Sequence, residues 1–435
     1  MKNMTSLLAG LALSLGVLGV FNVAQAADQD TVARGQYLAR AGDCMACHSA
    51  AGKPAYSGGL AIDSGHGIIY STNITPDKEH GIGNYSEAQF SAAVRHGVRA
   101  DGTQLYPAMP YPSYAKVSDE DIHALYTYFM QGVKPVASTP PASSMSFPFN
   151  IRWGMKLWNV FFANDKPFKE QDGWSAEIKR GAYLAEGLGH CGSCHTPRGF
   201  AMNEKASDSS QAQFLSGGDL NGWAVPSLRG MPHWSAQDIV DYLQTGRNKT
   251  ASVAGEMSLV VEHSTAHLKP EDLQSIAAYL KTLSPVASAS SGRVTPQGAE
   301  ATTKKLTAAK DLSLGERLYL DNCAACHRSS GKGYEETFPT LALSPTVNAE
   351  NPASLIRIVL EGAEMPWTHK APTQFAMPGF ASRLSDQEVA DVVTFIRSSW
   401  GNQASSVNAS DVAKVRKQLP EKKTVEAGSA PLAKQ

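Results

Sequence analysis

Apolar residues recur at three- and four-residue spacing in three stretches that lie far apart in the chain. Each stretch follows a helix-start signal, at Ser118, Lys269 and Ser385, with acidic residues just behind it. A serine followed three residues later by an acid is typical of a capping box, and the proline after Lys269 suits the first position of a helix. The pattern therefore predicts three amphipathic helices, over 119–130, 270–280 and 386–396.

Two further elements repeat in the same order. Short amphipathic helices are expected over 34–39, 180–185 and 314–320, and middle helices are expected behind the caps Ser86, Ser235 and Asn351. Each unit is then a helix, a five-residue motif, a long loop, a middle helix, a methionine-bearing loop and a final helix. This order predicts an all-α protein with three tandem domains, at 27–135, 173–284 and 309–401.

The remaining segments differ in composition from these units. The segments 136–172 and 285–308 contain stretches rich in Pro, Ser and Ala, which predict extended linkers, the first with an aromatic segment. Residues 402–435 are poor in apolar residues, and we expect a polar tail there.

The first 26 residues have the pattern of an export signal. Lys2 is followed by an apolar run of 14 residues and then by the small-residue site Ala24-Gln25-Ala26, which predicts a cleaved signal peptide at 1–26. The alternative is an uncleaved anchor, but a spanning helix needs ~20 apolar residues. We therefore expect an exported protein.

Length and charge limit the possible functions. A chain of 435 residues suggests about three domains at ~150 residues each. With 39 basic and 40 acidic residues the formal net charge is −1, so bulk charge indicates neither nucleic acid nor an anionic membrane as a partner. After the first 26 residues no segment approaches a transmembrane length. Any membrane association is expected through a partner or an interfacial segment.

All six cysteines belong to three copies of Cys-x-x-Cys-His, which is the attachment motif of c-type haem. Two thiols three positions apart lie on one face of a helical turn, where each can bond a haem vinyl group, and the next histidine can bind the iron. A zinc site would need further Cys or His at short offsets, and disulfides would leave the three histidines unexplained. We predict three covalently bound haem c groups, attached at Cys44, Cys47, Cys191, Cys194, Cys323 and Cys326, with His48, His195 and His327 on the irons.

Methionines at matched positions are candidates for the sixth iron ligand. Met109 lies 61 residues after the first motif histidine, Met257 62 after the second and Met377 50 after the third, each ahead of the final helix. Methionine opposite histidine raises the haem potential and closes the iron. The plainer alternative is that each methionine fills the core. Met365 competes with Met377 in the third unit, and the alternatives to Met257 are His263 and His267.

The order of elements resembles the cytochrome c fold, and longer segments resemble a narrower family. Segments such as Ala41–Cys44, Tyr70–Asp77, Tyr106–Tyr114, Gly189–Gly192 and Asp391–Arg397 are similar to those of the triheme cytochrome c subunits of membrane-bound periplasmic dehydrogenases. The resemblance covers about Arg34 to Trp400. One departure is Gly379, where an alanine is usual in those relatives.

The resemblance implies a role in electron transfer at the periplasmic face of the cytoplasmic membrane. Electrons would come from a separate catalytic subunit and pass to ubiquinone. That partner would be a flavoprotein of the gluconate 2-dehydrogenase type or, alternatively, a pyrroloquinoline-quinone alcohol or aldehyde dehydrogenase, with a small third subunit. The ligand pairs carried over are His48 with Met109, His195 with Met257, and His327 with Met377.

This chain alone is not expected to oxidise an organic substrate. It has no Rossmann-type flavin fingerprint, because its one Gly-x-Gly-x-x-Gly match, Gly187–Gly192, runs into the second Cys-x-x-Cys-His motif, and the predicted irons are six-coordinate. A free-standing multihaem peroxidase would need one five-coordinate iron. The cytochrome arm of a terminal oxidase would be expected to carry a transmembrane anchor.

The aromatic segment 151–162 predicts a helix with Arg152, Lys156 and Asn159 on one stripe and aromatic residues on the rest. Basic and aromatic faces together are typical of a helix that lies in a membrane interface. The alternative is that this helix packs two haem units together.

Overall fold

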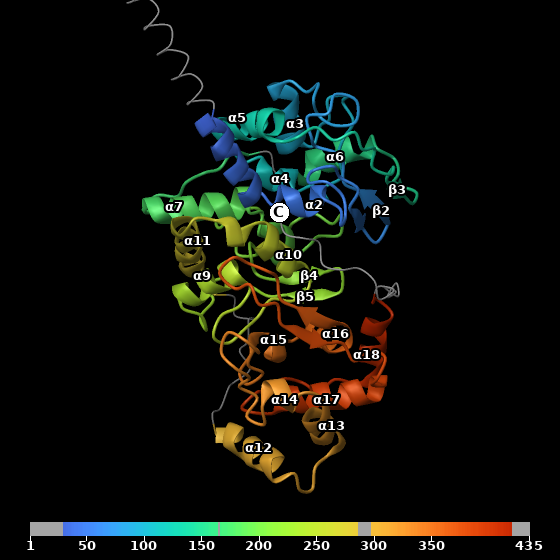
Figure 1. Ribbon diagram of the computed structural model, residues 1–435, viewed down its shortest axis with the longest axis vertical. Coiled ribbons are helices and arrows are strands. Elements are labelled where there is room, and N and C mark those ends of the chain that lie inside the picture. Colours follow the sequence, from blue (N-terminus) through green and yellow to red (C-terminus); the bar gives the residue numbers. More distant parts are fainter. Residues whose placement is uncertain (1–28, 164–165, 286–296, 420–435) are drawn as a thin grey trace, which may run out of the picture.

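The computed structural model describes residues 29–163, 166–285 and 297–419, in three units stacked along the long axis of the molecule (Figure 1). The predicted signal peptide lies outside the described residues. Among these residues, no helix combines the length and hydrophobicity needed to cross a bilayer. The fold is largely helical, but the all-α class is not confirmed, because three small antiparallel sheets accompany the helices.

The first unit packs its helices around the first Cys-x-x-Cys-His motif. Ser86 and Ser118 cap α3 and α5 as expected, and Gln89 completes a capping box at Ser86. The elements are a helix at 29–41, α2 (Cys44–His48), β1 (Ala61–Asp63), β2 (Gly67–Tyr70), α3 (Glu87–His96), α4 (Tyr111–Tyr114), α5 (Asp119–Thr127) and the π-helical turn η1 (Tyr128–Gly132).

The second unit repeats this order. Ser235 and Asp238 form the expected capping box, and Pro270 is the first residue of the final helix. Its elements are α7 (Ala176–Tyr183), the π-helical turn η2 (Leu184–Leu188), α8 (Gly192–His195), β4 (Gly218–Leu220), β5 (Trp223–Val225), α9 (Ala236–Thr245), α10 (Glu256–His263), the 3-10 turn η3 (Thr265–His267) and α11 (Pro270–Thr282).

The third unit has a core of its own. The middle helix begins one residue later than expected, since Pro352 is the N-cap and the Asn351 side chain accepts from the amide of Ala353 at 3.0 Å. The elements are α12 (Gln297–Ala308), α13 (Leu314–Asn322), α14 (Ala324–His327), α15 (Pro345–Asn348), α16 (Ala353–Glu361), β6 (Gly362–Glu364), β7 (Ala376–Pro378), α17 (Asp386–Ser398) and α18 (Ala409–Arg416).

The segments expected as linkers and tail are partly folded. Within 136–172, β3 (Ser144–Met145) pairs with β2, and α6 (Gly154–Phe162) packs on the first unit. Within 285–308, α12 places Leu306 in the third core. The polar tail expected from residue 402 is wrong for 402–419, because α18 buries Val412 and Val415 against the same core. These sparse apolar residues were too few to reveal a helix.

One hydrophobic core runs through the first two units, whereas the third unit has a separate core. Reciprocal contacts join units one and two. Arg34 and Tyr183 both bond Asp121, and Arg180 and Tyr37 both bond Asp272, at 2.5 to 3.0 Å. The third unit meets the second where the Ser354 hydroxyl of α16 bonds the backbone of Ala224 in β5. The first two units therefore form one body, with the third docked on its end.

Candidate haem centres

Each cysteine pair lies on a single helical turn, as the sequence predicts. Cys44 and Cys47 lie within α2, while Cys191 and Cys323 are the N-cap residues of α8 and α14. All six cysteines are free thiols. Burial raises the pKa of Cys44, Cys191 and Cys323 to about 12, so the environment disfavours thiolates. An uncharged sulfur, as in a thioether, suits such a site.

Each motif histidine is held by a backbone carbonyl on a distant loop. Nδ1–H of His48 donates to the carbonyl oxygen of Thr72 at 2.7 Å. His195 donates to Pro226 at 2.8 Å and His327 to Pro339 at 3.0 Å. Desolvation lowers the pKa of all three rings, which favours the neutral form. Because a carbonyl only accepts, Nδ1 carries the proton and the lone pair of Nε2 is left for a metal. This donor set fits a haem iron.

A glycine amide also holds the backbone carbonyl of each motif histidine. The amides of Gly58, Gly217 and Gly333 donate to the carbonyls of His48, His195 and His327 at 2.8, 2.8 and 3.1 Å. The three glycines have positive φ values of 73°, 89° and 59°. At Gly58, a Cβ would overlap the backbone of Thr72, the residue that holds the histidine ring. Only glycine fits this position without displacing the loop.

Sequence reasoning missed these supporting residues. The glycine follows the motif histidine after 10, 22 and 6 residues, so no fixed spacing marks it. The structure does show one shared feature, which is an apolar residue two positions after the residue whose carbonyl holds the histidine ring. These apolar residues donate their backbone amides to the carbonyl of the residue two positions before the supporting glycine; they are Ile74, Leu228 and Leu341.

The three candidate methionines occupy different local structures. Met109 lies in the turn before α4 and packs against the shared core of units one and two. Met377 lies on β7 opposite Ala363 of β6 and packs against the third core. The expected loop position is wrong for Met257, which is the second residue of α10. Their role as iron ligands stays a prediction.

The rival ligands have other contacts. Met365 is 7% exposed, and its sulfur lies 3.6 Å from Nη1 of Arg247 in the second unit. Nε2 of His267 lies 2.9 Å from the carbonyl oxygen of Glu262. Desolvation lowers the pKa of His263. The contacts of Met365 and His267 favour Met377 and Met257 as the candidates.

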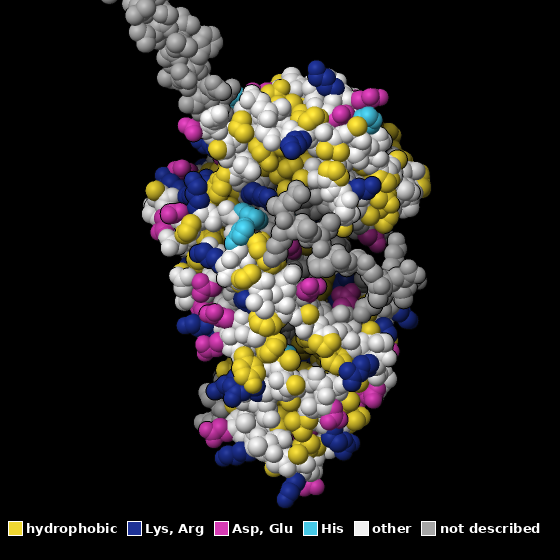
Figure 2. Space-filling view, in the orientation of Figure 1, with side chains coloured by type: hydrophobic (Ala, Val, Ile, Leu, Met, Phe, Trp, Pro, Cys, Tyr) yellow, Lys and Arg dark blue, Asp and Glu magenta, His cyan; other side chains and the backbone are white. Residues whose placement is uncertain are grey.

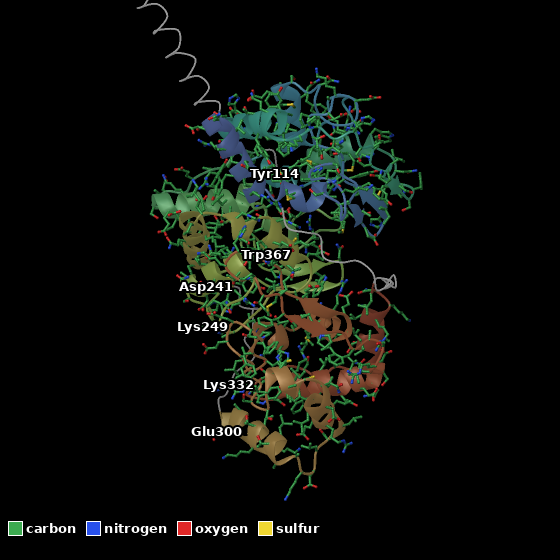
Figure 3. The ribbon with its side chains drawn as sticks, viewed as in Figure 1. Tyr114, Asp241, Lys249, Glu300, Lys332 and Trp367 are labelled. Carbon is green, nitrogen blue, oxygen red and sulfur yellow. The ribbon has the colours of Figure 1, made fainter. Side chains whose placement is uncertain are left out.

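The first and second motifs lie close together where their units meet. Tyr114, at this junction in Figure 3, donates its hydroxyl to the carbonyl of Gly42 at 2.6 Å, and its ring meets that of His190 edge-on at 5.6 Å. Burial lowers the pKa of His190 to about 4, so this ring is neutral. Burial raises the pKa of Cys47 to about 11. Because Gly42 and His190 lie next to the first and second motifs, the contacts of Tyr114 bring the two attachment sites side by side.

The family model described as cytochrome c matches residues 32–132, 178–284 and 312–400. The chain is 47% identical over 423 residues to the cytochrome c subunit of alcohol dehydrogenase (quinone) from Gluconacetobacter polyoxogenes, with 94% of this chain and 88% of that protein covered.

Two further relatives are cytochrome subunits of other dehydrogenases. The gluconate 2-dehydrogenase cytochrome c subunit of Pantoea cypripedii is 48% identical over 419 residues, covering 94% of each chain. The fructose dehydrogenase cytochrome subunit of Gluconobacter japonicus is 37% identical over 423 residues, covering 91% of this chain and 85% of that protein.

Proposed function

The chain belongs to the cytochrome c family, among the cytochrome c subunits of dehydrogenase complexes, and from this premise we propose that it passes electrons from a separate catalytic subunit to ubiquinone. Its cofactors are three covalently bound haem c groups, one for each domain. The observation that carries the proposal is the threefold site, in which each motif histidine has Nδ1 bonded to a backbone carbonyl, so that Nε2 is left to bind a metal.

The site residues then have distinct roles. The six motif cysteines tether the haems through thioethers, His48, His195 and His327 bind the irons, and Met109, Met257 and Met377 are the sixth ligands. When bound, each haem supplies a reversible one-electron couple. The carbonyls of Thr72, Pro226 and Pro339 fix the histidine rings and increase their basicity.

The arrangement of the units supports a linear relay. Figure 1 shows the second unit between the first and the third, and the contacts between units follow the same order. An electron that enters at one end therefore passes through the second unit to reach the other. Each haem in this relay is placed and tuned by the protein, and the organic substrate is oxidised on the partner.

The partner proposed first is a flavoprotein of the gluconate 2-dehydrogenase type, with a small third subunit. The match to the gluconate 2-dehydrogenase cytochrome subunit spans 94% of both chains, whereas the alcohol dehydrogenase subunit extends further beyond this chain. A pyrroloquinoline-quinone alcohol or aldehyde dehydrogenase is the alternative partner. Export to the periplasmic face of the cytoplasmic membrane is part of the proposal, since c-type haem is attached outside the bacterial cytoplasm.

The test uses the haem-loaded chain purified with its native partner. Substrate of the catalytic subunit is expected to reduce all three haems, and a soluble ubiquinone analogue is expected to reoxidise them. A co-purifying flavin indicates the first partner and pyrroloquinoline quinone the alternative. Haems that stay oxidised with substrate, or a rapid reaction with peroxide at a high-spin iron, would contradict the relay.

A further inference from the structure

Seven large apolar side chains are exposed together beside the first unit. They belong to α6 and its neighbours, and exposure reaches 78% at Val160, 79% at Phe147 and 95% at Phe200. We call this set the α6 face; it consists of Phe147, Phe149, Trp153, Leu157, Val160, Phe161 and Phe200. Ring contacts from Phe161 to Phe162 and from Phe162 to Phe200 connect its parts. In Figure 2 hydrophobic side chains gather along the edge where Figure 1 places α6 and β3.

The polar side of α6 faces the protein. The guanidinium of Arg152 donates to the carbonyl of Gln104 at 2.9 Å and stacks 3.9 Å from the ring centre of Tyr106. The amide of Asn159 donates to the Gln104 side chain at 2.8 Å and accepts from the hydroxyl of Tyr111 at 2.6 Å. Soluble helices normally bury their apolar side. This helix has the reverse orientation, so its exposed face requires an apolar environment outside the protein.

Charge indicates which environment that is. No aspartate or glutamate occurs from Ile122 to Asn164, whereas Lys134, Arg152 and Lys156 lie in this segment, and the Lys156 side chain is exposed beside the α6 face. A nine-residue helix is too short to span a bilayer. Aromatic side chains with flanking lysine are typical of segments that lie in the headgroup region. We propose that the α6 face inserts into the surface of an anionic lipid bilayer.

This docking would bring the first haem unit to the membrane. The loop that carries Met109 lies directly under α6, because the hydroxyl of Tyr106 donates to the carbonyl of Phe149 at 2.8 Å and Tyr111 bonds Asn159. The first haem would then be the one nearest to a membrane quinone, a consequence that rests on the proposed function. The docking itself depends only on the α6 face.

The experiment measures co-sedimentation of the exported, haem-loaded chain with vesicles of phosphatidylcholine and phosphatidylglycerol. The wild-type chain is expected to bind. Val160→Glu together with Phe161→Glu is expected to reduce partitioning roughly tenfold or more, because both exposed side chains would bring charge into the acyl boundary. Leu314→Glu is the matched control, since Leu314 is 42% exposed in the third unit, and it should bind like the wild type.

A second variant tests the electrostatic part. Lys156→Glu should weaken binding to these anionic vesicles and leave binding to pure phosphatidylcholine vesicles unchanged. Equal binding of the double variant and the wild type, or no binding of the wild type, would overturn the proposal. In a separate co-purification, the double variant should retain the catalytic subunit; loss of that subunit with unchanged vesicle binding would show that the face is a protein interface and would overturn the proposal. No partner or quinone is present in the vesicle assay, so failure of the relay leaves its result unaffected.

Discussion

The hydroxyl of Tyr37 in the first unit donates a 2.5 Å hydrogen bond to the carboxylate of Asp272 in the second. Tyr183 returns the contact to Asp121 at 2.6 Å. These residues occupy matching positions of the repeat, since both tyrosines lie three residues after an arginine, and each arginine bonds the aspartate of its own unit. The interface is therefore self-complementary, like that of a symmetric dimer within one chain.

Replacing Asp272 by asparagine should destabilise this interface. Burial opposes ionisation of Asp272, but hydrogen bonds from Arg180 and Tyr37 outweigh it and hold the pKa of this carboxyl below its ordinary value. Asp272→Asn should lower the free energy of unfolding by about 1–3 kcal/mol at pH 7. Because this pKa is lower in the folded protein than in the unfolded chain, the ionised Asp272 carboxyl stabilises the fold at pH values above the unfolded pKa. This stabilisation is lost as the pH falls through the folded pKa.

Urea titrations at several pH values check this expectation. The difference between wild type and Asp272→Asn should be full at neutral pH and shrink below about pH 4. Asp172→Asn changes an exposed carboxylate and serves as the control. A difference that grows on acidification would contradict the assignment.

The buried pair between Lys116 and Glu186 also joins units one and two. Their charged atoms lie 3.2 Å apart with side chains 4% and 3% exposed. Glu186→Leu should cost about 3–5 kcal/mol, because it leaves a buried ammonium without its counter-charge. The double change Lys116→Met with Glu186→Leu should be less destabilising than the single change. Equal or greater destabilisation in denaturant titrations of the double variant would show that the pair is not coupled in this way.

Gly181 marks the close approach of α7 and α11. A Cβ at this position would overlap the carbonyl oxygen of Ser275, so Gly181→Ala should lower the free energy of unfolding by about 1–3 kcal/mol or more. Gly154→Ala is the matched control, since a Cβ there meets nothing within 4 Å. Thermal unfolding of both variants distinguishes packing from a general effect of alanine. Similar melting temperatures for the two would argue against a tight crossing.

Met377 and Met365 are rival candidates for the sixth iron ligand of the third haem. Met377→Leu should open the iron of the third unit, lower its potential and remove the methionine–iron charge-transfer absorption of that haem. Met365→Leu should leave these properties unchanged, because the Met365 sulfur contacts Arg247. Redox titration and near-infrared spectra of the two variants give the answer. The same replacements at Met109 and Met257 should affect the first and second haems, and three unchanged spectra would reject all three ligands.

Short-range patterns predicted much of this structure. The cysteine motifs, the caps at Ser86, Ser118, Ser235 and Ser385 and the helices behind them depend on residues within a few positions of one another, so they could be read from the sequence. The family resemblance supplied the assembly into three cytochrome c domains.

Long-range contacts were beyond this reasoning. The carbonyl of Pro339 reaches His327 across a loop of a different length from that between Pro226 and His195. The orientation of α6 depends on Gln104, which lies 55 residues before its partner Asn159 in α6. The period of α6 could be predicted from the sequence, but the side that packs on the protein depends on these distant polar partners.

The division between one core shared by the first two units and a second core confined to the third has a practical meaning for protein engineering. The third unit is the exchangeable module because it has its own core, although a counterpart from a relative would have to match its contacts with the second unit, which include Ser354 with Ala224 and Met365 with Arg247. The first two units would have to be transplanted together, since separating them would expose buried side chains of both and leave Lys116 and Glu186 without each other.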